Sequence, residues 1–297
     1  MGYKEGTPTI SKLFPHSEYI KELNVAYKVV QDAMRVCENI WAAQRHSTLI
    51  KADSSPVTRM CQHIRVLCDM TLIVADFTAQ LVIARAIRES FPVDDIIAEE
   101  DISSLSDDQL AQMAAFTDTS CLAKLLTEHS STKSRFWVVD PIDGTLGYIN
   151  DGQYACCIGL LEDGKAMVAV LGCPRLVTPL GKGAIFVAAH NCGSFLVCPD
   201  SGEWSKLPLA CNTANGIVTL VESREKKHSD MSFSQELMAR LGIESRMSMD
   251  SQCKYGLVAA RCAHVFLRKS ADPNYRTRIW VKDKMIFLLL IMSYNIV

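Results

Sequence analysis

A hexapeptide near the middle of the chain, D-P-I-D-G-T at residues 140–145, directly follows an apolar run at 136–139. That run, F-W-V-V, predicts a buried β-strand, because aromatic and β-branched residues are typical of strands. Pro141 has no N–H to donate to a strand ladder, and Gly144 allows a tight turn of the backbone. The segment therefore predicts a strand that ends in a turn, with two carboxylates and a hydroxyl at the strand end.

The two carboxylates of this turn, Asp140 and Asp143, can converge on one point in space. Oxygen ligands of this kind suit Mg²⁺, and a pair of such ions can hold a phosphate ester and activate water. The pattern D-x-x-D-G is also a common turn signal. The pentapeptide alone therefore leaves both a metal site and a purely structural turn open.

The hexapeptide resembles the signature of the lithium-sensitive, magnesium-dependent phosphatase superfamily that includes inositol monophosphatase, fructose bisphosphatase and 3'(2'),5'-bisphosphate nucleotidase. Four further segments resemble this superfamily in the same order: K-A-D-S-S-P-V-T at 51–58 with A-D-F at 75–77, A-E-E-D at 98–101, L-G-Y at 146–148, and D-S-Q-C-K-Y at 250–255 with V-F-L-R at 265–268 and residues 275–280. The L-G-Y segment is similar to the L-G-F of the nucleotidases rather than to the T-N-F of the inositol monophosphatases. The resemblance therefore favours the nucleotidase branch.

The resemblance implies a metal site and a catalytic pair. Four residues would supply oxygen ligands to Mg²⁺: Glu99, Asp140, Asp143 and, through its carbonyl, Ile142. Asp53 and Thr145 would orient and deprotonate the attacking water, a general-base role that a carboxylate can fill through a hydroxyl. Without the surrounding motifs, Asp53 reads as a turn residue, Glu99 as part of a solvated acidic loop and Thr145 as a helix cap.

The resemblance also implies that residues from both halves of the chain bind substrate. The matching positions are Gly144, His228, Ser251, Lys254 and Arg268. A cation and hydroxyls suit a second phosphate, which a monoester enzyme would not need. His228 lies in the charged run at 222–230, so a solvent-exposed surface histidine is an equal alternative for it.

We therefore expect a Mg²⁺-dependent phosphatase that acts on the 3'-phosphate of adenosine 3',5'-bisphosphate. By resemblance, the sulfated analogue is a second substrate and Li⁺ an inhibitor. One alternative is an inositol polyphosphate 1-phosphatase. Another is a catalytically impaired, truncated isoform, or a non-enzymatic protein that binds a nucleotide or a partner.

Two segments depart from the family pattern. The family continues I-W with D-H-A-A-G, whose Asp is a metal ligand, whereas Val281 follows Trp280 here, and Asp283 lies two residues late, about 200° around a helix. Residues 59–73 are interposed where the family runs almost directly from S-P-V-T to V-A-D-F. We hypothesise that 59–73 and 281–297 are translated intron or mis-predicted exon sequence, which sequencing of transcripts across both junctions would test.

Composition limits the partners. The 297 residues carry a net charge of −2 with 22% charged residues, which gives no electrostatic reason to expect a nucleic-acid polymer or an anionic membrane as partner. A small anionic substrate fits, because bound metal would supply local positive charge. The apolar run at 285–292 is shorter than the roughly 20 residues that a spanning helix needs. Oligomeric state does not follow from the sequence.

The cysteines and the N-terminal residues bear on the compartment. Twelve cysteines without paired C-x-x-C spacing predict reduced thiols and do not favour zinc ligation. The first residues contain neither the apolar core of a secretory signal nor the Arg-rich and Ser-rich pattern of a transit peptide. We therefore expect a cytoplasmic protein.

Apolar periodicity in the first half predicts helices and an antiparallel hairpin. Spacings of three, four and seven residues predict helices at 20–41 and 75–89. Ser106 with Gln109 predicts a capping box that opens a further helix through Ala115. A hairpin is predicted from two apolar runs joined by E-D-G, at 154–161 and 165–173.

The second half alternates short apolar runs with a helix. The runs lie near 184–189, 194–198 and 217–222, and a helix at 232–241 is stopped by Gly242. The whole predicts an α+β protein of two packed units, an α+β domain at 1–175 that carries the metal site and an α/β nucleotide-binding domain at 176–297. The resemblance implies the layered α-β-α-β-α sandwich of the inositol monophosphatase and fructose bisphosphatase type, with an incomplete second sheet.

Overall fold

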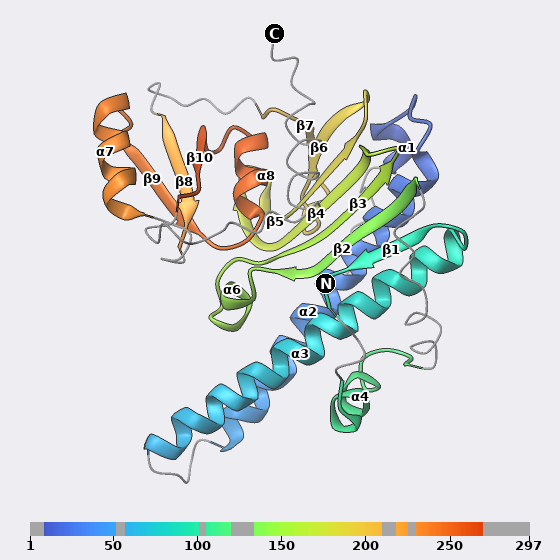
Figure 1. Ribbon diagram of the computed structural model, residues 1–297, viewed down its shortest axis with the longest axis vertical. Coiled ribbons are helices and arrows are strands. Elements are labelled where there is room, and N and C mark those ends of the chain that lie inside the picture. Colours follow the sequence, from blue (N-terminus) through green and yellow to red (C-terminus); the bar gives the residue numbers. More distant parts are fainter. Residues whose placement is uncertain are drawn as a thin grey trace.

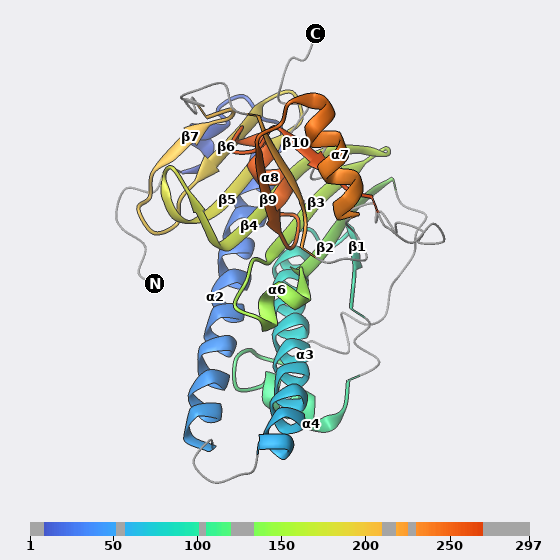
Figure 2. The same ribbon diagram turned by 90° about the vertical axis from the view of Figure 1, so that its left-hand side faces the viewer.

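The structure is a computed structural model that describes residues 9–51, 57–100, 105–119, 134–209, 218–224 and 230–269, and for 44–51 and 57–69 it describes the backbone alone. Two β-sheets alternate with three helical layers (Figures 1 and 2). Helices α2 and α3 cover the outer face of the large sheet, α8 lies between the two sheets, and α7 covers the outer face of the small sheet. This arrangement confirms the predicted α-β-α-β-α layering.

The outer layer consists of α2 (Ile20–Lys51) and α3 (Val57–Ser90), which lie side by side and extend beyond the sheet (Figure 2). Helix α2 packs on strands β3 and β4, and α3 packs on β2. Leu23, Val30 and Cys37 of α2, spaced by seven residues, are fully buried, as the apolar stripe predicted. Helix α3 contains the predicted helix at 75–89 but begins earlier, at Val57, so residues 59–73 form its first part.

Among the described residues, one stretch, Met70–Ser90 of α3, is long and apolar enough to cross a membrane. This stretch is 67% buried inside the protein. Leu81, Ile83 and Ile87 all belong to the main hydrophobic core. Its apolar composition is therefore accounted for by packing against the sheet.

The large sheet has seven strands in the order of the chain: β1 (Asp95–Ala98), β2 (Arg135–Asp143), β3 (Ala155–Glu162), β4 (Lys165–Thr178), β5 (Gly181–Ala189), β6 (Gly193–Val197) and β7 (Trp204–Lys206). Strand β1 pairs with β2 in parallel, and each later pair is antiparallel. The predicted hairpin is confirmed as β3–β4. Asp163 and Gly164 both have positive φ, 50° and 74°, as a two-residue type I′ turn requires.

The small sheet has three parallel strands in the order β10 (Val265–Leu267), β8 (Thr219–Ser223), β9 (Ser245–Met249). Helix α7 (Met231–Leu241) ends at Gly242, whose φ is 64°, so the predicted stop is confirmed. Helix α8 (Cys253–Ala259) joins the sheets. Its Gly256 lies against the ring of Phe186 on β5, and Val221 of β8 shares the same hydrophobic cluster.

The sequence-based assignment of the runs at 184–189 and 194–198 to a second α/β unit was wrong. They form β5 and β6 of the large sheet, because glycines with positive φ, Gly181 and Gly193, connect them to their neighbours by short turns. The expected boundary at 175 lies inside β4, and the small sheet begins at Thr219. The division into two folding units stays a prediction.

Three short helices complete the described elements: α1 (Ile10–Leu13), α4 (Asp107–Met113) and α6 (Thr145–Ile149). The capping box before α4 is confirmed. The Ser106 hydroxyl accepts the Gln109 N–H at 3.3 Å, and Gln109 Oε1 accepts the Ser106 N–H at 2.7 Å. The helix ends two residues before Ala115.

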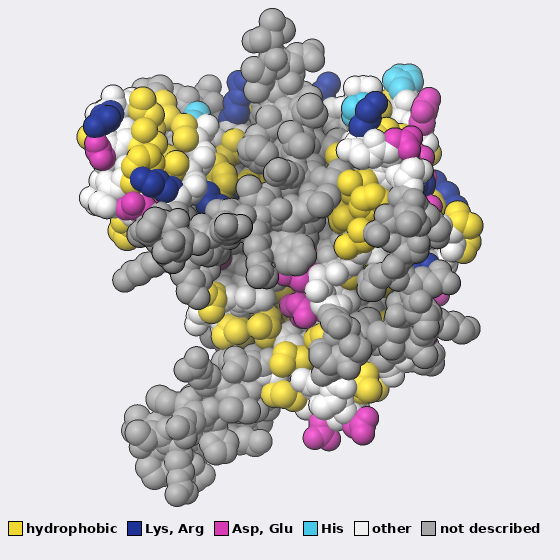
Figure 3. Space-filling model, in the orientation of Figure 1, with side chains coloured by type: hydrophobic (Ala, Val, Ile, Leu, Met, Phe, Trp, Pro, Cys, Tyr) yellow, Lys and Arg dark blue, Asp and Glu magenta, His cyan; other side chains and the backbone are white. Residues whose placement is uncertain are grey.

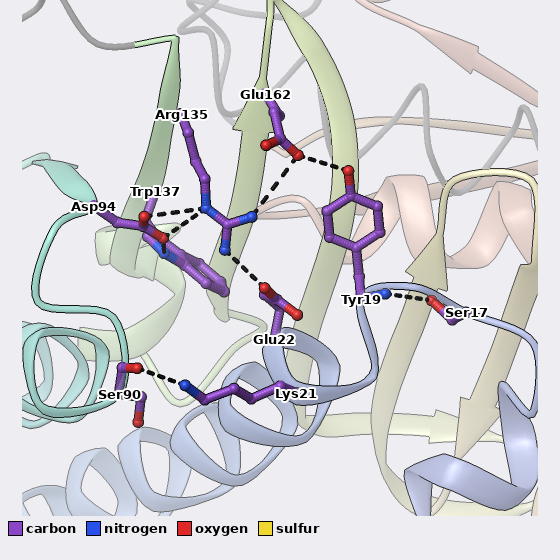
Figure 4. A network of polar contacts seen from close by, with 9 residues as sticks. All are labelled: Ser17, Tyr19, Lys21, Glu22, Ser90, Asp94, Arg135, Trp137 and Glu162. Atoms are coloured by element: carbon purple, nitrogen blue, oxygen red, sulfur yellow. Dashed lines mark hydrogen bonds and ion pairs between the residues drawn. The ribbon is translucent and has the colours of Figure 1, made fainter.

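A polar network ties the outer helices to the amino end of β2 (Figure 4). Arg135 Nε donates to both oxygens of Asp94, at 3.1 and 3.0 Å, and Trp137 Nε1 donates to Asp94 Oδ2 at 2.9 Å. Arg135 also reaches Glu22 of α2 at 2.7 Å. Tyr19 donates to Glu162 of β3 at 2.6 Å. The network fixes α2, β2 and β3 at the end of the sheet opposite Asp140.

Candidate functional site

The carboxyl end of β1 lies beside β2, just before Asp140. Ala98 of β1 is the register partner of Val139 of β2 in this parallel pair. The residue that follows each of them in the chain is acidic: Glu99 after Ala98 and Asp140 after Val139. Neighbouring strands are about 4.8 Å apart, so the backbones of these two residues lie near each other where the pairing ends. Asp140 is buried, at 2% exposure, whereas Glu99 is exposed. Figure 3 shows acidic side chains at the centre of the face that it displays.

Strand β2 has a β-bulge between Asp140 and Asp143. The two intervening residues, Pro141 and Ile142, lie opposite a single residue of β3, Cys156. In a regular strand, positions three residues apart point to opposite faces. One extra residue reverses this, so the bulge turns Asp143 toward the side of Asp140. The interruption predicted at Pro141 is confirmed.

The backbone turns sharply after the bulge. Gly144 is left-handed, with φ 89° and ψ 50°, and Thr145 then begins α6. This conformation favours glycine, because a Cβ is disfavoured at positive φ. The predicted tight turn is confirmed, and Thr145 is exposed beside it.

The turn after β9 packs directly on this glycine. A Cβ built on Gly144 would lie 2.6 Å from Cβ of Ser251, so there is no room for a larger residue. Ser251 itself has a φ of 65°. The backbone N–H of Gln252 donates to Oδ2 of Asp143. The small sheet is thereby joined to the acidic turn of the large sheet at one point.

Lys254 on α8 is buried, and its ammonium is held by its own chain. Its Nζ donates to the carbonyls of Met249 at 3.1 Å and Ser251 at 2.6 Å. Burial lowers the pKa of Lys254, and the nearby carboxylate of Asp143 opposes that shift. In this structure Lys254 therefore braces the turn at 249–251. Its predicted contact with a substrate phosphate stays a prediction.

Charged side chains follow the carboxyl ends of the three parallel strands. Arg224 follows β8, Asp250 follows β9 and Arg268 follows β10. Arg224 NH1 lies 3.8 Å from Asp250 Oδ2, and its side chain is 59% exposed. Ligands of parallel α/β sheets bind at this end of the strands. The edge beside Ser251 thus carries two guanidinium groups near the acidic turn.

The model of the Inositol monophosphatase family matches residues 23–280 of this chain. The chain belongs to the inositol monophosphatase family. It is 29% identical over 309 residues to 3'(2'),5'-bisphosphate nucleotidase 2 of Candida albicans, covering 88% of this chain and 82% of that protein. It is 31% identical over 284 residues to the 3'(2'),5'-bisphosphate nucleotidase of Dictyostelium discoideum, covering 86% and 79%. These relatives are phosphatases.

Solved structures of the inositol monophosphatase family share the fold. CysQ from Bacteroides thetaiotaomicron, a bacterial member of the family, superposes with a TM-score of 0.57 at 17% identity, over 91% of this chain and 86% of that one. The inositol monophosphatase from Anabaena superposes with a TM-score of 0.53 at 17% identity, over 92% and 81%. The predicted layered sandwich is therefore confirmed by comparison as well as by the strand order.

Metal dependence is general in the inositol monophosphatase family, and the donors at the β1–β2 edge suit it. In the described part of the chain, no group of three or more Asp, Glu, His or Cys side chains is arranged so that it could hold a metal ion. Mg²⁺ usually takes one or two carboxylates and completes its shell with water and phosphate oxygens. The carboxylates of Glu99, Asp140 and Asp143 and the carbonyl of Ile142 are hard oxygen donors, the chemistry that such a site uses, and their joint binding of one metal ion stays a prediction.

Two of the predicted site residues, Asp53 and His228, lie outside the described residues, as do Val281 and Asp283. Two polar residues of α3 lie near the site: the sequence interpretation quoted Asp76 only as part of the A-D-F motif and gave it no role, and it missed Gln80. Asp76 and Gln80 are 5% and 2% exposed, and they lie one turn apart on the helix that packs against β2 and α6. The sequence did contain a signal for both residues, namely polar side chains on the buried stripe of an apolar helix, but it was not used to assign them a role.

Proposed function

We propose that this chain is a Mg²⁺-dependent phosphatase that removes the 3'-phosphate of adenosine 3',5'-bisphosphate, giving AMP and phosphate. The names of its relatives support this substrate. So does the L-G-Y segment at 146–148, which resembles the nucleotidase branch. The 5'-phosphosulfate analogue is the expected second substrate.

The observation that carries the proposal is the contact between Gly144 and Ser251. It places the acidic turn of the large sheet against the carboxyl ends of the small sheet. A nucleotide with two phosphates needs both parts, oxygen donors for the phosphate that is cleaved and cations for the one that is kept. Among the described residues, Arg268, which follows β10, and Arg224, which follows β8, offer guanidinium groups for the second phosphate.

The reaction adds water to phosphorus and breaks the bond from phosphorus to the ribose 3'-oxygen, which leaves with a proton. Bound Mg²⁺ would neutralise the charge that builds on the phosphate oxygens and on the leaving oxygen. Asp143 is held in place for this task by the backbone N–H of Gln252. The Thr145 hydroxyl, exposed at the start of α6, would orient the attacking water.

Two carboxylates are candidates for the general base that takes the proton from this water. Asp53 was assigned by resemblance. Asp76 is buried on α3, which packs against α6, the helix that begins at Thr145. A carboxylate relayed through a hydroxyl can act as a general base, which typically contributes about 10²–10⁴-fold to the rate.

The test is phosphate release from adenosine 3',5'-bisphosphate by the purified chain, with Mg²⁺ titrated and Li⁺ added. A matched protein carries the family ending D-H-A-A-G in place of the residues from 281. We expect Mg²⁺-dependent release that Li⁺ inhibits, at least in the matched protein. Release from inositol 1,4-bisphosphate but not from the nucleotide would instead identify an inositol polyphosphate 1-phosphatase.

A second candidate function is nucleotide binding without hydrolysis. The observation that favours it is Val281, which occupies the position of a metal-ligand Asp in the family pattern. Loss of one carboxylate weakens one of two metal positions. Tight binding of the nucleotide with no phosphate release, combined with release by the protein that carries the family ending, would establish this second function.

A further inference from the structure

The acidic segment after β1 is held by a buried side chain of α3. Gln80 Nε2 donates to the carbonyl of Glu100 at 2.7 Å, and Gln80 Oε1 accepts the Glu100 N–H at 3.0 Å. One primary amide thus binds both backbone groups of a single residue. Gln80 is 2% exposed, so water does not compete for these bonds.

This clamp acts where the strand ladder has ended. The pairing of β1 with β2 stops at Ala98 and Val139, so Glu99 and Glu100 lie beyond the last register pair. Backbone groups that leave a sheet need other partners. Gln80 provides them from a rigid helix, since its neighbours Ala79 and Leu81 are fully buried in the core.

Gln is suited to this position because its side-chain amide has one donor group and one acceptor group. Both are needed to bind an N–H and a C=O at once. Glutamate would keep the acceptor but lose the donor when ionised, and methionine would keep the length but lose both.

A second contact from α3 reaches the other end of β1, because Arg88 NH1 lies 3.5 Å from the carbonyl oxygen of Asp94.

We propose that Gln80 is a positioning residue that fixes Glu99 beside Asp140 and thereby sets the metal affinity of the site. The inference rests on the proposed function, in which Glu99 is a metal ligand. Gln80 touches neither metal nor substrate. It acts through the backbone of Glu100, and groups that orient metal ligands typically change metal affinity by about 10–100-fold when removed.

The test is direct binding of Mn²⁺, as a spectroscopic substitute for Mg²⁺, to the purified full chain and to two variants. Gln80→Met removes both hydrogen bonds. Leu81→Ala, at the adjacent position, removes core packing but leaves the clamp. We expect Gln80→Met to raise the Mn²⁺ Kd by about 10-fold or more and to speed hydrogen exchange of the Glu100 amide. Leu81→Ala is expected to lower Tm with an unchanged Kd.

Equal Kd values for the wild type and Gln80→Met would overturn the inference, as would equal weakening in both variants, since general destabilisation would then explain the loss. Absence of Mn²⁺ binding by the wild type would overturn it together with the metal site. Weakened binding in Gln80→Met, with no phosphate release by the wild type, would support the inference while the proposed function fails. If Gln80→Met does not fold, Gln80→Leu, which also removes both hydrogen bonds, replaces it with the same expectation.

Discussion

Ala98 of β1 is the parallel register partner of Val139 of β2, and Glu99 and Asp140 are the residues that follow this last pair. We predict that Asp140→Asn abolishes phosphate release, lowering kcat/KM by about 10³-fold or more, because a buried metal-binding charge is lost. The measurement is initial rate at saturating Mg²⁺, with folding verified by circular dichroism. Asp163→Asn is the control, since Asn also tolerates the left-handed turn conformation there. Equal rates for Asp140→Asn and wild type would exclude Asp140 from the site.

Substitutions at two glycines distinguish the cost of steric crowding from the cost of backbone strain. Gly144 and Gly164 both have positive φ, 89° and 74°, but a Cβ on Gly164 would meet nothing within 4 Å. We predict that Gly164→Ala costs about 1 kcal/mol of unfolding free energy. Gly144→Ala is expected to cost more and to lose activity, because its Cβ would collide with Ser251. Urea denaturation of both variants measures the difference.

A second substitution tests the cause of that difference. Ser251→Gly removes the Cβ that Gly144→Ala would strike and suits the φ of 65° at that position. The double variant Gly144→Ala/Ser251→Gly is expected to recover most of the stability lost by Gly144→Ala. If it recovers none, the collision with Ser251 is not what makes Gly144 necessary.

We predict that breaking the Arg135 network lowers the stability of the protein without changing its catalytic rate. Arg135→Met leaves the Asp94 carboxylate, which is 5% exposed, without its guanidinium partner. Removing one partner of a buried pair costs about 3–5 kcal/mol, and partial exposure of Arg135 reduces our expectation to about 2–3 kcal/mol. Arg240→Met, in an exposed pair with Glu236, is the control, with an expected cost below about 1 kcal/mol. Unfolding free energies from urea titration decide, and kcat should change in neither variant.

Local features of this chain were readable from sequence. The E-D-G signal predicted the β3–β4 hairpin, because a type I′ turn depends on the residues of the turn itself. The capping box at Ser106 and the stop at Gly242 have the same local origin. The interruption of β2 at Pro141 was also predicted, since a missing N–H acts at one position, although the strand itself continues through the bulge to Asp143.

Features that depend on distant residues were less accessible. The sheet that β5 joins is decided by pairing with β4, which an apolar run alone does not encode. The bracing role of Lys254 depends on the carbonyls of a turn that only the fold brings to its ammonium. Gln80 was missed for the same reason, because its partner Glu100 lies twenty residues away and across the helix–sheet interface.

Helix α7 gives a pH-dependent prediction. Its N-cap carboxylate, Asp230, accepts hydrogen bonds from the Ser232 hydroxyl at 2.7 Å and the Phe233 N–H at 3.2 Å, and these bonds lower the pKa of Asp230. A lowered folded-state pKa means that the stabilisation is present above the unfolded-state pKa and is lost as pH falls through the folded-state value. Asp230→Asn keeps an acceptor that does not ionise.

The Tm difference between the wild type and Asp230→Asn should therefore shift in favour of the variant as pH falls from 7 toward about 3, near the usual Asp pKa. Asp230→Ala, which removes the cap, should be less stable than wild type at neutral pH. A Tm difference between wild type and Asp230→Asn that is independent of pH would show that the carboxylate charge contributes nothing at this cap.

The identity of the general base can be decided between Asp76 and Asp53. Asp76 is buried on α3 one turn before Gln80, and α3 packs against the helix that begins at Thr145. We predict that Asp76→Asn lowers kcat by about 10²–10⁴-fold and removes the acidic limb of the pH–rate profile, with the Mn²⁺ Kd unchanged. Asp53→Asn is measured beside it. A large loss of kcat in Asp53→Asn with little loss in Asp76→Asn would assign the role to Asp53, because the base is the carboxylate whose removal slows chemistry without releasing metal.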